Sequence, residues 1–163
     1  MSSFNDKIIS LLADGASADG IHIRPICDDY DLWFATVECQ LHPHQTDLVN
    51  PAGFSIGRAY LNPEANVPCI IWKDDVRIGY IVFRQWRNQN ANGWSYFIDK
   101  SIQGKGYGTA AAKLSVAILK SADPSTPVKL SVEQTNKQAQ HLYTSIGFCH
   151  KGEMDGDDLV FEY

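Results

Sequence analysis

The chain has 163 residues, 44% of them hydrophobic, and a formal net charge of −5. This length suits one domain with a single core, and the hydrophobic content is that of a globular protein. The acidic balance argues against nucleic acid or an anionic membrane as a partner. No apolar run reaches the roughly 18 residues that a membrane span needs, and the N-terminus lacks the features of a signal peptide.

The cysteines and histidines show no pattern of a disulfide framework or a metal site. Cys27, Cys39, Cys69 and Cys149 are scattered along the chain without a C-x-x-C pair. We therefore expect reduced, mostly buried thiols and a cytoplasmic location. The histidine spacing matches no metal-ligand pattern, so we expect no bound metal.

The first part of the chain predicts two helices and a strand. Residues 1–20 hold a short helix and a Gly- and Ser-containing stretch, which we interpret as an N-terminal extension and linker before a domain at 21–163. A strand is expected at 21–26, and a helix starts at Asp28 or Asp29 and stops before Pro43. Its apolar side is predicted to hold Trp33, Phe34, Val37 and Leu41.

A hairpin and a third strand are predicted next. A short helix at 55–61 precedes two β-rich runs that are joined by a tight turn at Asp74 and Asp75. A polar turn then leads into another strand. The strands are expected at 67–73, 76–86 and 94–99.

The last third alternates helices and strands. A helix at 107–120 and a strand at 128–133 are followed by a helix that Thr135 or Asn136 can cap and that Gly147 can end. A final hairpin is predicted from 148–153 and 159–163, turning through Asp155 and Gly156.

A glycine-rich loop at residues 103–108 precedes the 107–120 helix and reads Gln-Gly-Lys-Gly-Tyr-Gly. Glycines at alternate positions let backbone N–H groups approach a ligand, and the helix N-terminus adds partial positive charge. Together they predict a phosphate site. The spacing is neither that of a P-loop nor that of a dinucleotide fingerprint, and an ordinary strand-to-helix turn is the competing interpretation.

A second motif lies about 30 residues further on, where 135–148 reads Thr-Asn-Lys-Gln-Ala-Gln-His-Leu-Tyr-Thr-Ser-Ile-Gly-Phe. Together, Gln-x-x-Gly-x-Gly and Asn-x-x-Ala-x-x-Leu-Tyr-x-x-x-Gly-Phe resemble the GNAT (Gcn5-related N-acetyltransferase) superfamily, over residues 21–163. The resemblance implies an α/β fold: a mixed, mostly antiparallel central sheet of six to seven strands with helices on both faces. It also implies acetyl-CoA as co-substrate.

The resemblance implies which residues hold acetyl-CoA. Backbone amides of the glycine loop would bind the pyrophosphate, Gln103 would order the loop, and Lys105 would point outward or contact the cofactor. A bulged strand before the loop would bond to the pantetheine amides, with the Ile98 amide as a candidate oxyanion donor. The implied cofactor residues are Tyr96, Phe97, Ile98, Gln103, Gly104, Lys105, Gly106, Tyr107, Gly108, Thr109, Asn136 and Tyr143.

The chemistry implied is attack of a neutral amine on the thioester, which needs an acid and a base. Tyr143 matches the family's proton donor to the leaving thiolate, and its alternative is a core aromatic. Glu38 and Glu133 are the candidate bases, each acting through a chain of water molecules. Asp99 is a third candidate that ranks below them. Asn136 is either a cofactor contact or only a helix cap.

Residues 41–62 also resemble bacterial spermine/spermidine and diamine N-acetyltransferases, which implies a small polyamine as the acceptor and a homodimer. Trp94 and Ser95 stand where those enzymes often carry an acidic residue. The acidic segment 153–158 could attract a polycation or be a solvated turn. Another amine, such as a protein N-terminus, a lysine, an amino acid or an aminoglycoside, and a non-catalytic acyl-CoA-binding module are the alternatives.

Overall fold

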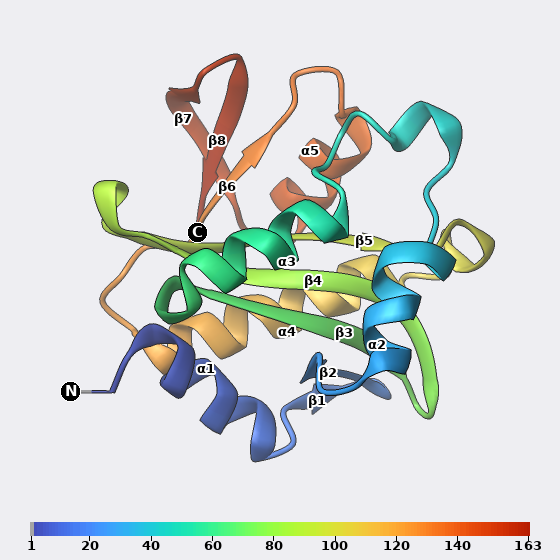
Figure 1. Ribbon diagram of the computed structural model, residues 1–163. Helices are drawn as coiled ribbons and strands as arrows, with labels where there is room; N and C mark the ends of the chain where they lie inside the picture. The colour runs from blue at the N-terminus through green and yellow to red at the C-terminus, as the bar shows by residue number, and fades with distance from the viewer. Residues whose placement is uncertain (1) are drawn as a thin grey trace.

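The computed structural model describes residues 2–163, which form an α/β fold built on two antiparallel sheets (Figure 1). The first sheet has five strands in the order β1-β2-β3-β4-β5, and the second has three in the order β6-β8-β7. The strands of the first sheet are β1 (Ser17–Ala18), β2 (Ile21–Pro25), β3 (Asn66–Lys73), β4 (Val76–Trp86) and β5 (Ala91–Ile98). Those of the second are β6 (Lys129–Val132), β7 (Cys149–Asp155) and β8 (Asp158–Glu162).

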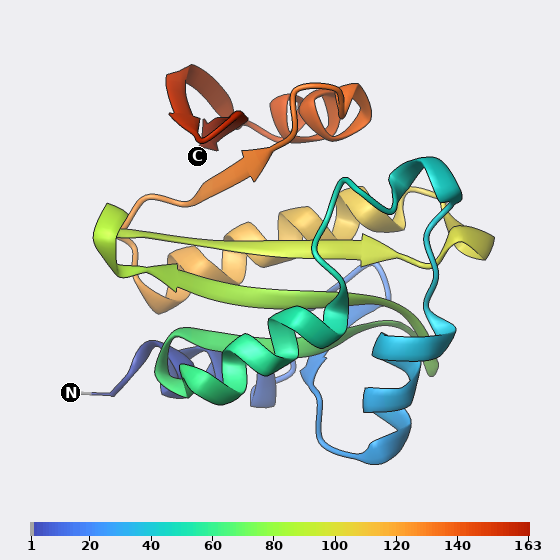
Figure 2. The same ribbon diagram turned by 45° about the horizontal axis from the view of Figure 1, so that its top comes forward.

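The predicted single sheet of six to seven strands is divided between β5 and β6. These strands share one parallel bridge, between Asn92 and Val128, and then diverge, as Figure 2 shows. At the contact point a Cβ on Gly93 would lie 2.1 Å from the carbonyl oxygen of Lys129, so the backbones touch there. Beyond this bridge β5 pairs with β4 alone, so within the described residues its other edge has no strand partner, while β6 pairs with β8.

Helices cover both faces of the first sheet, as predicted (Figure 1). α1 (Phe4–Ala13) and α4 (Tyr107–Ala122) pack on the face that carries Ile81 and Phe83. α2 (Asp29–Trp33) and α3 (Ala52–Leu61) lie on the face of Tyr80 and Val82. This alternation follows from the two-residue period of a strand.

The N-terminal helix packs against the rest of the fold. Phe4, Ile8 and Leu12 recur at helical spacing and are buried in the larger core. The stretch that we interpreted as a linker contains β1, in which Ser17 pairs with His22 of β2. Residues 4–18 therefore contribute a helix and a strand to the folded domain.

The second predicted helix was expected to bury four side chains, and this is wrong for Trp33, Val37 and Leu41. Trp33 is 56% and Val37 43% exposed, whereas Phe34 is buried. After Trp33 the helix widens into a π-helical turn, η1 (Phe34–Glu38), closed by a 2.8 Å bond from the Cys39 amide to the Phe34 carbonyl. The wider turn changes which side chains face the sheet, and Leu41 lies beyond the helix end.

Two other boundaries differ from prediction. α3 begins at Ala52, directly after Pro51, and not at residue 55. β5 begins at Ala91 and not at 94, because a short turn, η4 (Arg87–Gln89), ends in Asn90 with a left-handed φ of 45°. The hairpin of β3 and β4, α4, and α5 (Lys137–Ser145) agree closely with the prediction. Three short 3₁₀ turns complete the fold: η2 (Pro43–Gln45), η3 (Pro63–Ala65) and η5 (Lys100–Ile102).

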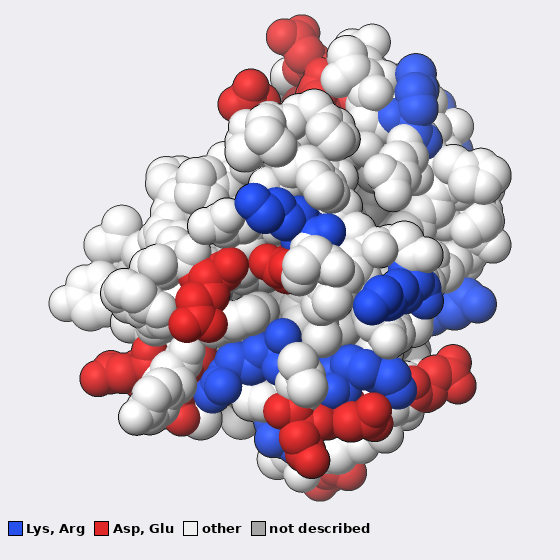
Figure 3. Space-filling view, turned by 90° about the vertical axis from the view of Figure 1, so that its right-hand side faces the viewer, with Lys and Arg blue, Asp and Glu red and all other residues white. Residues whose placement is uncertain are grey.

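The surface on the right-hand side of Figure 1 carries charges of both signs. Figure 3 shows basic side chains beside acidic ones there, separated by wide areas without charge. This face therefore has no broad basic patch of the kind that binds nucleic acid.

Candidate active site

A cavity of about 780 Å³ lies where β5 and β6 diverge. Its walls come from β5, the glycine loop, the start of α4, α5, β6, the loop at 41–50, the tip of the last hairpin and individual positions of α3 and β4. The predicted site residues that line it are Tyr96, Phe97, Ile98, Gln103, Gly104, Gly106, Tyr107, Gly108, Thr109, Glu133, Asn136 and Tyr143. Lys105 and Glu38 do not line it, and both are exposed.

The glycine loop leaves room for a ligand at the N-terminus of α4. Gly104 and Gly106 have φ values of +79° and +84°, and a Cβ built on either would meet nothing within 4 Å. Gly106 is the N-cap of the 16-residue α4, and no side chain caps that end. Open N–H groups at a helix N-terminus favour an anion, so the loop fits a phosphate group.

Two glutamine side chains hold the glycine loop against the segment at 41–50. The amides of Gln45 and Gln103 donate to each other's oxygen, both at 3.0 Å. Gln103 also donates to the Ile98 carbonyl at 2.9 Å. These bonds agree with a loop-ordering role for Gln103, which stays a prediction. The contact of Gln45 was missed because its partner is 58 residues away.

The free edge of β5 faces the cavity in a regular pattern. β4 and β5 pair continuously from Gly79–Ile98 to Trp86–Ala91 without a register shift, so the bulge predicted in this strand is absent from this ladder. The Asn92 amide donates toward β6, to Pro127. Backbone groups alternate along a strand, so the N–H groups of 94, 96 and 98 point away from β4, as that of Asn92 does. The N–H group of Phe97 points toward β4 instead.

Tyr143 lies in an aromatic cluster at the inner end of the cavity. It is 8% exposed, and its ring packs edge-on against Trp94 with centroids 6.2 Å apart. Burial raises the pKa of Tyr143 well above its ordinary value, so the phenol stays protonated at neutral pH. Trp94 itself is buried and packs edge-on against both Tyr143 and Phe148.

Two further contacts fix the helices that frame the site. The side-chain oxygen of Asn136 accepts from the Ala139 amide at 3.1 Å, so Asn136 caps α5 and also lines the cavity. The Tyr96 hydroxyl donates to the Gly108 carbonyl at 3.0 Å and ties β5 to the first turn of α4.

Three carboxylates line the wall formed by β6 and the last hairpin: Glu133, Asp155 and Asp158. Glu133 accepts a 2.7 Å bond from the Thr135 hydroxyl. Burial raises the pKa of Asp158, and the neighbouring charges of Asp155 and Glu133 add to this. Asp158 is thus a further candidate base. The signal for it in the sequence was the acidic segment 153–158. Asp99 instead accepts from the Gln40 and Ser101 amides, at 2.8 and 2.9 Å.

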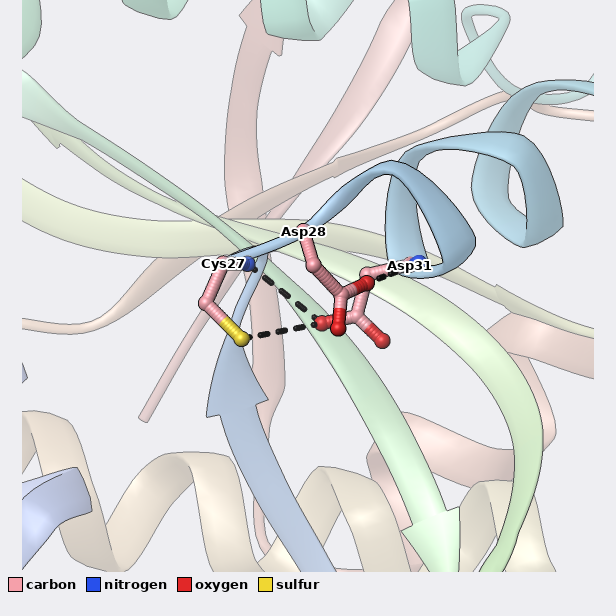
Figure 4. Close-up of side chains that lie close together, drawn as sticks. All are labelled: Cys27, Asp28 and Asp31. Atoms are coloured by element: carbon pink, nitrogen blue, oxygen red, sulfur yellow. Dashed lines mark hydrogen bonds between the residues drawn. The ribbon is translucent and has the colours of Figure 1, made fainter.

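A separate cluster of Cys27, Asp28 and Asp31 has ligand atoms within 4.8 Å of one another (Figure 4). Asp28 accepts from the Asp31 amide at 2.8 Å and caps α2. Asp31 accepts from the Cys27 backbone at 3.3 Å and forms a 2.8 Å ion pair with Arg77. These contacts make the cluster a helix cap that anchors α2 to β4.

Residues 30–148 match the model of the acetyltransferase (GNAT) family, and the chain belongs to this family. A curated relative, "Probable spermine N(1)-acetyltransferase" of Bacillus subtilis subsp. natto, is 35% identical over 80 residues, covering 47% of this chain and 53% of that protein. The chain thus spans about half the length of the curated relatives it matches.

Solved structures share the fold at low sequence identity. An aminoglycoside acetyltransferase in complex with ribostamycin and coenzyme A has a TM-score of 0.71 and 20% identity, covering 88% of this chain and 92% of that one. A spermidine N-acetyltransferase from Vibrio cholerae, in complex with CoA and spermine, has a TM-score of 0.69 and 16% identity, covering 89% and 94%.

Within residues 2–163, no helix combines the length and the apolar character that crossing a membrane requires.

Proposed function

We propose that this protein transfers the acetyl group of acetyl-CoA to a primary amine of a small molecule. The observation that carries the proposal is one cavity lined, in this order along β5, by an open glycine loop, a free strand edge and a buried tyrosine. From Ile98 beside the loop to Trp94 beside Tyr143, β5 extends about 14 Å at the usual rise of a strand. A phosphate-bearing thioester would therefore lie along β5.

The residues present fit acetyl-CoA. Backbone N–H groups of the glycine loop and of the first turn of α4 would hold the pyrophosphate. The free N–H groups of 94, 96 and 98 would bond to the pantetheine amides as an added strand does, with Ile98 as the proposed oxyanion donor. Several structural neighbours of the chain are described in complex with CoA or acetyl-CoA, which supports the proposal.

The reaction would proceed by direct attack within a ternary complex. The amine nitrogen forms a bond to the thioester carbon, the carbon–sulfur bond breaks, one proton leaves the nitrogen and the sulfur gains one. Tyr143, protonated because it is buried, would supply the proton to sulfur and recover one from solvent. Its position in the cavity weighs against a non-catalytic acyl-CoA-binding module.

The base would be a carboxylate that accepts the amine proton through water. Glu133 and Asp158 both line the cavity, and the raised pKa of Asp158 makes its carboxylate a stronger base than that of an ordinary aspartate. Glu38 lies outside this lining, so we assign it no part in the proposed mechanism.

A polyamine is the first acceptor to consider. The names of the curated relatives and the carboxylates Glu133, Asp155 and Asp158 support it. Arg58 and Arg84, on another wall of the cavity, oppose it because they carry the same charge as a polyamine. A homodimer stays a prediction from the family resemblance, and a cytoplasmic location stays a prediction from the cysteine pattern.

Release of the CoA thiol in the presence of a panel of amines tests the proposal. We expect turnover that needs both acetyl-CoA and an amine, with an acetylated amine as the product. Acetyl-CoA binding without turnover of any polyamine, amino acid, peptide or aminoglycoside would contradict transfer and favour the binding module.

A further inference from the structure

Two arginines line the end of the cavity that lies away from the glycine loop. Arg58 comes from α3 and Arg84 from β4. Arg84 pairs with Gly93 of β5, whereas the glycine loop follows Ile98 at the other end of that strand. Five residues of strand separate these positions by about 17 Å. The arginines therefore lie beyond the place of the thioester, on the side where an acceptor would enter.

Both guanidinium groups lack a carboxylate partner among the ion pairs of residues 2–163. Arg58 lies over the Phe54 ring, 4.8 Å from its centroid, and Arg84 lies over the Trp86 ring at 5.4 Å. Two other arginines do have carboxylate partners: Arg77 with Asp31 at 2.8 Å and Arg87 with Glu64 at 3.0 Å. The aromatic rings hold the guanidinium planes but do not balance their charge.

The two positive charges raise each other's energy. Both arginines are half-buried. Burial lowers the pKa of Arg84, and the charge of Arg58 adds to the lowering, while Asp155 opposes it. Arginine nevertheless stays charged at neutral pH. The carboxylates that line the cavity are Asp47, Glu133, Asp155 and Asp158, and Asp155 is the one whose charge acts on Arg84. One carboxylate does not balance two guanidinium groups, so a bound anionic group would be favourable beside them.

Charges of opposite sign therefore face each other across the acceptor end. The α3 and β4 wall carries Arg58 and Arg84, and the β6 and last-hairpin wall carries Glu133, Asp155 and Asp158. A polyamine would place positive groups beside both arginines, and the repulsion between like charges would weaken its binding. An amine that also bears a carboxylate matches both walls, because a guanidinium binds a carboxylate through two parallel bonds.

We propose that Arg58 and Arg84 form a subsite for a carboxylate of the acceptor. The acceptor is then a primary amine that carries a carboxylate, such as an amino acid or a peptide with a free C-terminus. This inference rests on the proposed acetyl transfer and specifies its substrate class.

Acceptors that differ only in the charge of one end test the subsite. Putrescine, γ-aminobutyramide and γ-aminobutyrate share a four-carbon chain with a positive, neutral or negative end, and glycylglycinamide and glycylglycine form a longer pair. In the native protein we expect kcat/KM to be at least tenfold higher for the carboxylate member of at least one set. In Arg84→Gln and Arg58→Gln this preference should fall about tenfold, with the KM for acetyl-CoA unchanged.

Arg87→Gln is the matched control, because Arg87 lies close along the chain to Arg84 but outside the cavity. It should keep the full carboxylate preference. A native preference for the amides or for putrescine, or equal losses for all acceptors in Arg84→Gln, would overturn the subsite.

A binding experiment separates failure of the subsite from failure of acetyl transfer. If no acceptor is turned over, the proposed function is wrong. Calorimetric titration of glycylglycine and γ-aminobutyrate into the CoA-saturated protein then decides the subsite alone. Binding that Arg84→Gln weakens about tenfold supports it, and binding that is absent or unaffected overturns it.

Discussion

The Tyr143 side chain combines two properties that a proton donor to a thiolate needs. It borders the cavity, and its burial keeps the hydroxyl protonated. Its ring packs edge-on against Trp94 and lies 5.6 Å from Phe148 between centroids, so the ring is fixed in a packed aromatic cluster.

Replacing Tyr143 by Phe should lower kcat by roughly 10²-fold, because it removes the proton donor and leaves the ring packing. Affinity for acetyl-CoA, measured by calorimetry, should change little. Steady-state CoA release at saturating amine checks this. An unchanged kcat would make Tyr143 a structural aromatic only.

The glycine loop owes its anion site to backbone conformation. Replacing Gly106 by Val places a branched side chain on a residue with a φ of +84°, in the open space before α4. We expect acetyl-CoA affinity to fall at least tenfold, about 1.4 kcal/mol, by calorimetry.

Gly15→Val is the control for strain, since Gly15 has a φ of +81° and open surroundings far from the cavity. It should show a similar loss of stability and normal acetyl-CoA binding. Equal affinity in the two variants would place the cofactor elsewhere.

At the scale of elements, the site exists because β5 and β6 touch at one end and diverge at the other. The contact is tightest at Gly93, next to the Asn92–Val128 bridge. The aromatic ring of Trp86 also lies within 3 Å of a Cβ at this position, so no side chain fits without movement.

Gly93→Ala should therefore lower the free energy of unfolding by about 1–3 kcal/mol, as overpacking usually does. Gly57→Ala should do the reverse and raise it by about 0.5–1 kcal/mol, since Gly57 is exposed in α3 with no atom near its Cβ. Urea denaturation of both variants checks the pair. A neutral Gly93→Ala would show that the strand contact is adaptable.

Local patterns in the sequence predicted the parts of the site that single segments form. The glycine loop, its helix, and α5 with its Asn136 cap and Tyr143 each have a motif of their own. The division of the sheet could not be predicted in this way, because it depends on how β6 pairs with β8. The Gln45–Gln103 and Arg58–Arg84 pairs were missed for the same reason, since each joins distant segments. The π turn after Trp33 could not be predicted either, because no periodic pattern of apolar residues marks it.

On the scale of the whole molecule, α1 is part of the single folded unit. It packs on α4, β2 and β3 and fills the same core as the sheet. We propose that residues 4–18 are required for stability, although the motifs of the site all lie after residue 40.

Two adjacent isoleucines test this. Ile8 is fully buried and Ile9 is 42% exposed. Ile8→Ala should lower the free energy of unfolding by about 2–5 kcal/mol through the cavity it leaves, whereas Ile9→Ala should cost well under 1 kcal/mol. Similar small effects in both, by denaturant titration, would mean that α1 is dispensable.

The central claim is that the cavity transfers an acetyl group to an amine, and isotope-labelled acetyl-CoA tests it most directly. The protein is incubated with acetyl-CoA labelled in the acetyl group and with the amines named above, and the products are analysed by mass spectrometry. We predict that the label appears on the nitrogen of at least one amine, in proportion to free CoA, and that Tyr143→Phe slows both together. Label that stays on CoA, or appears only as acetate, with every amine would contradict the claim.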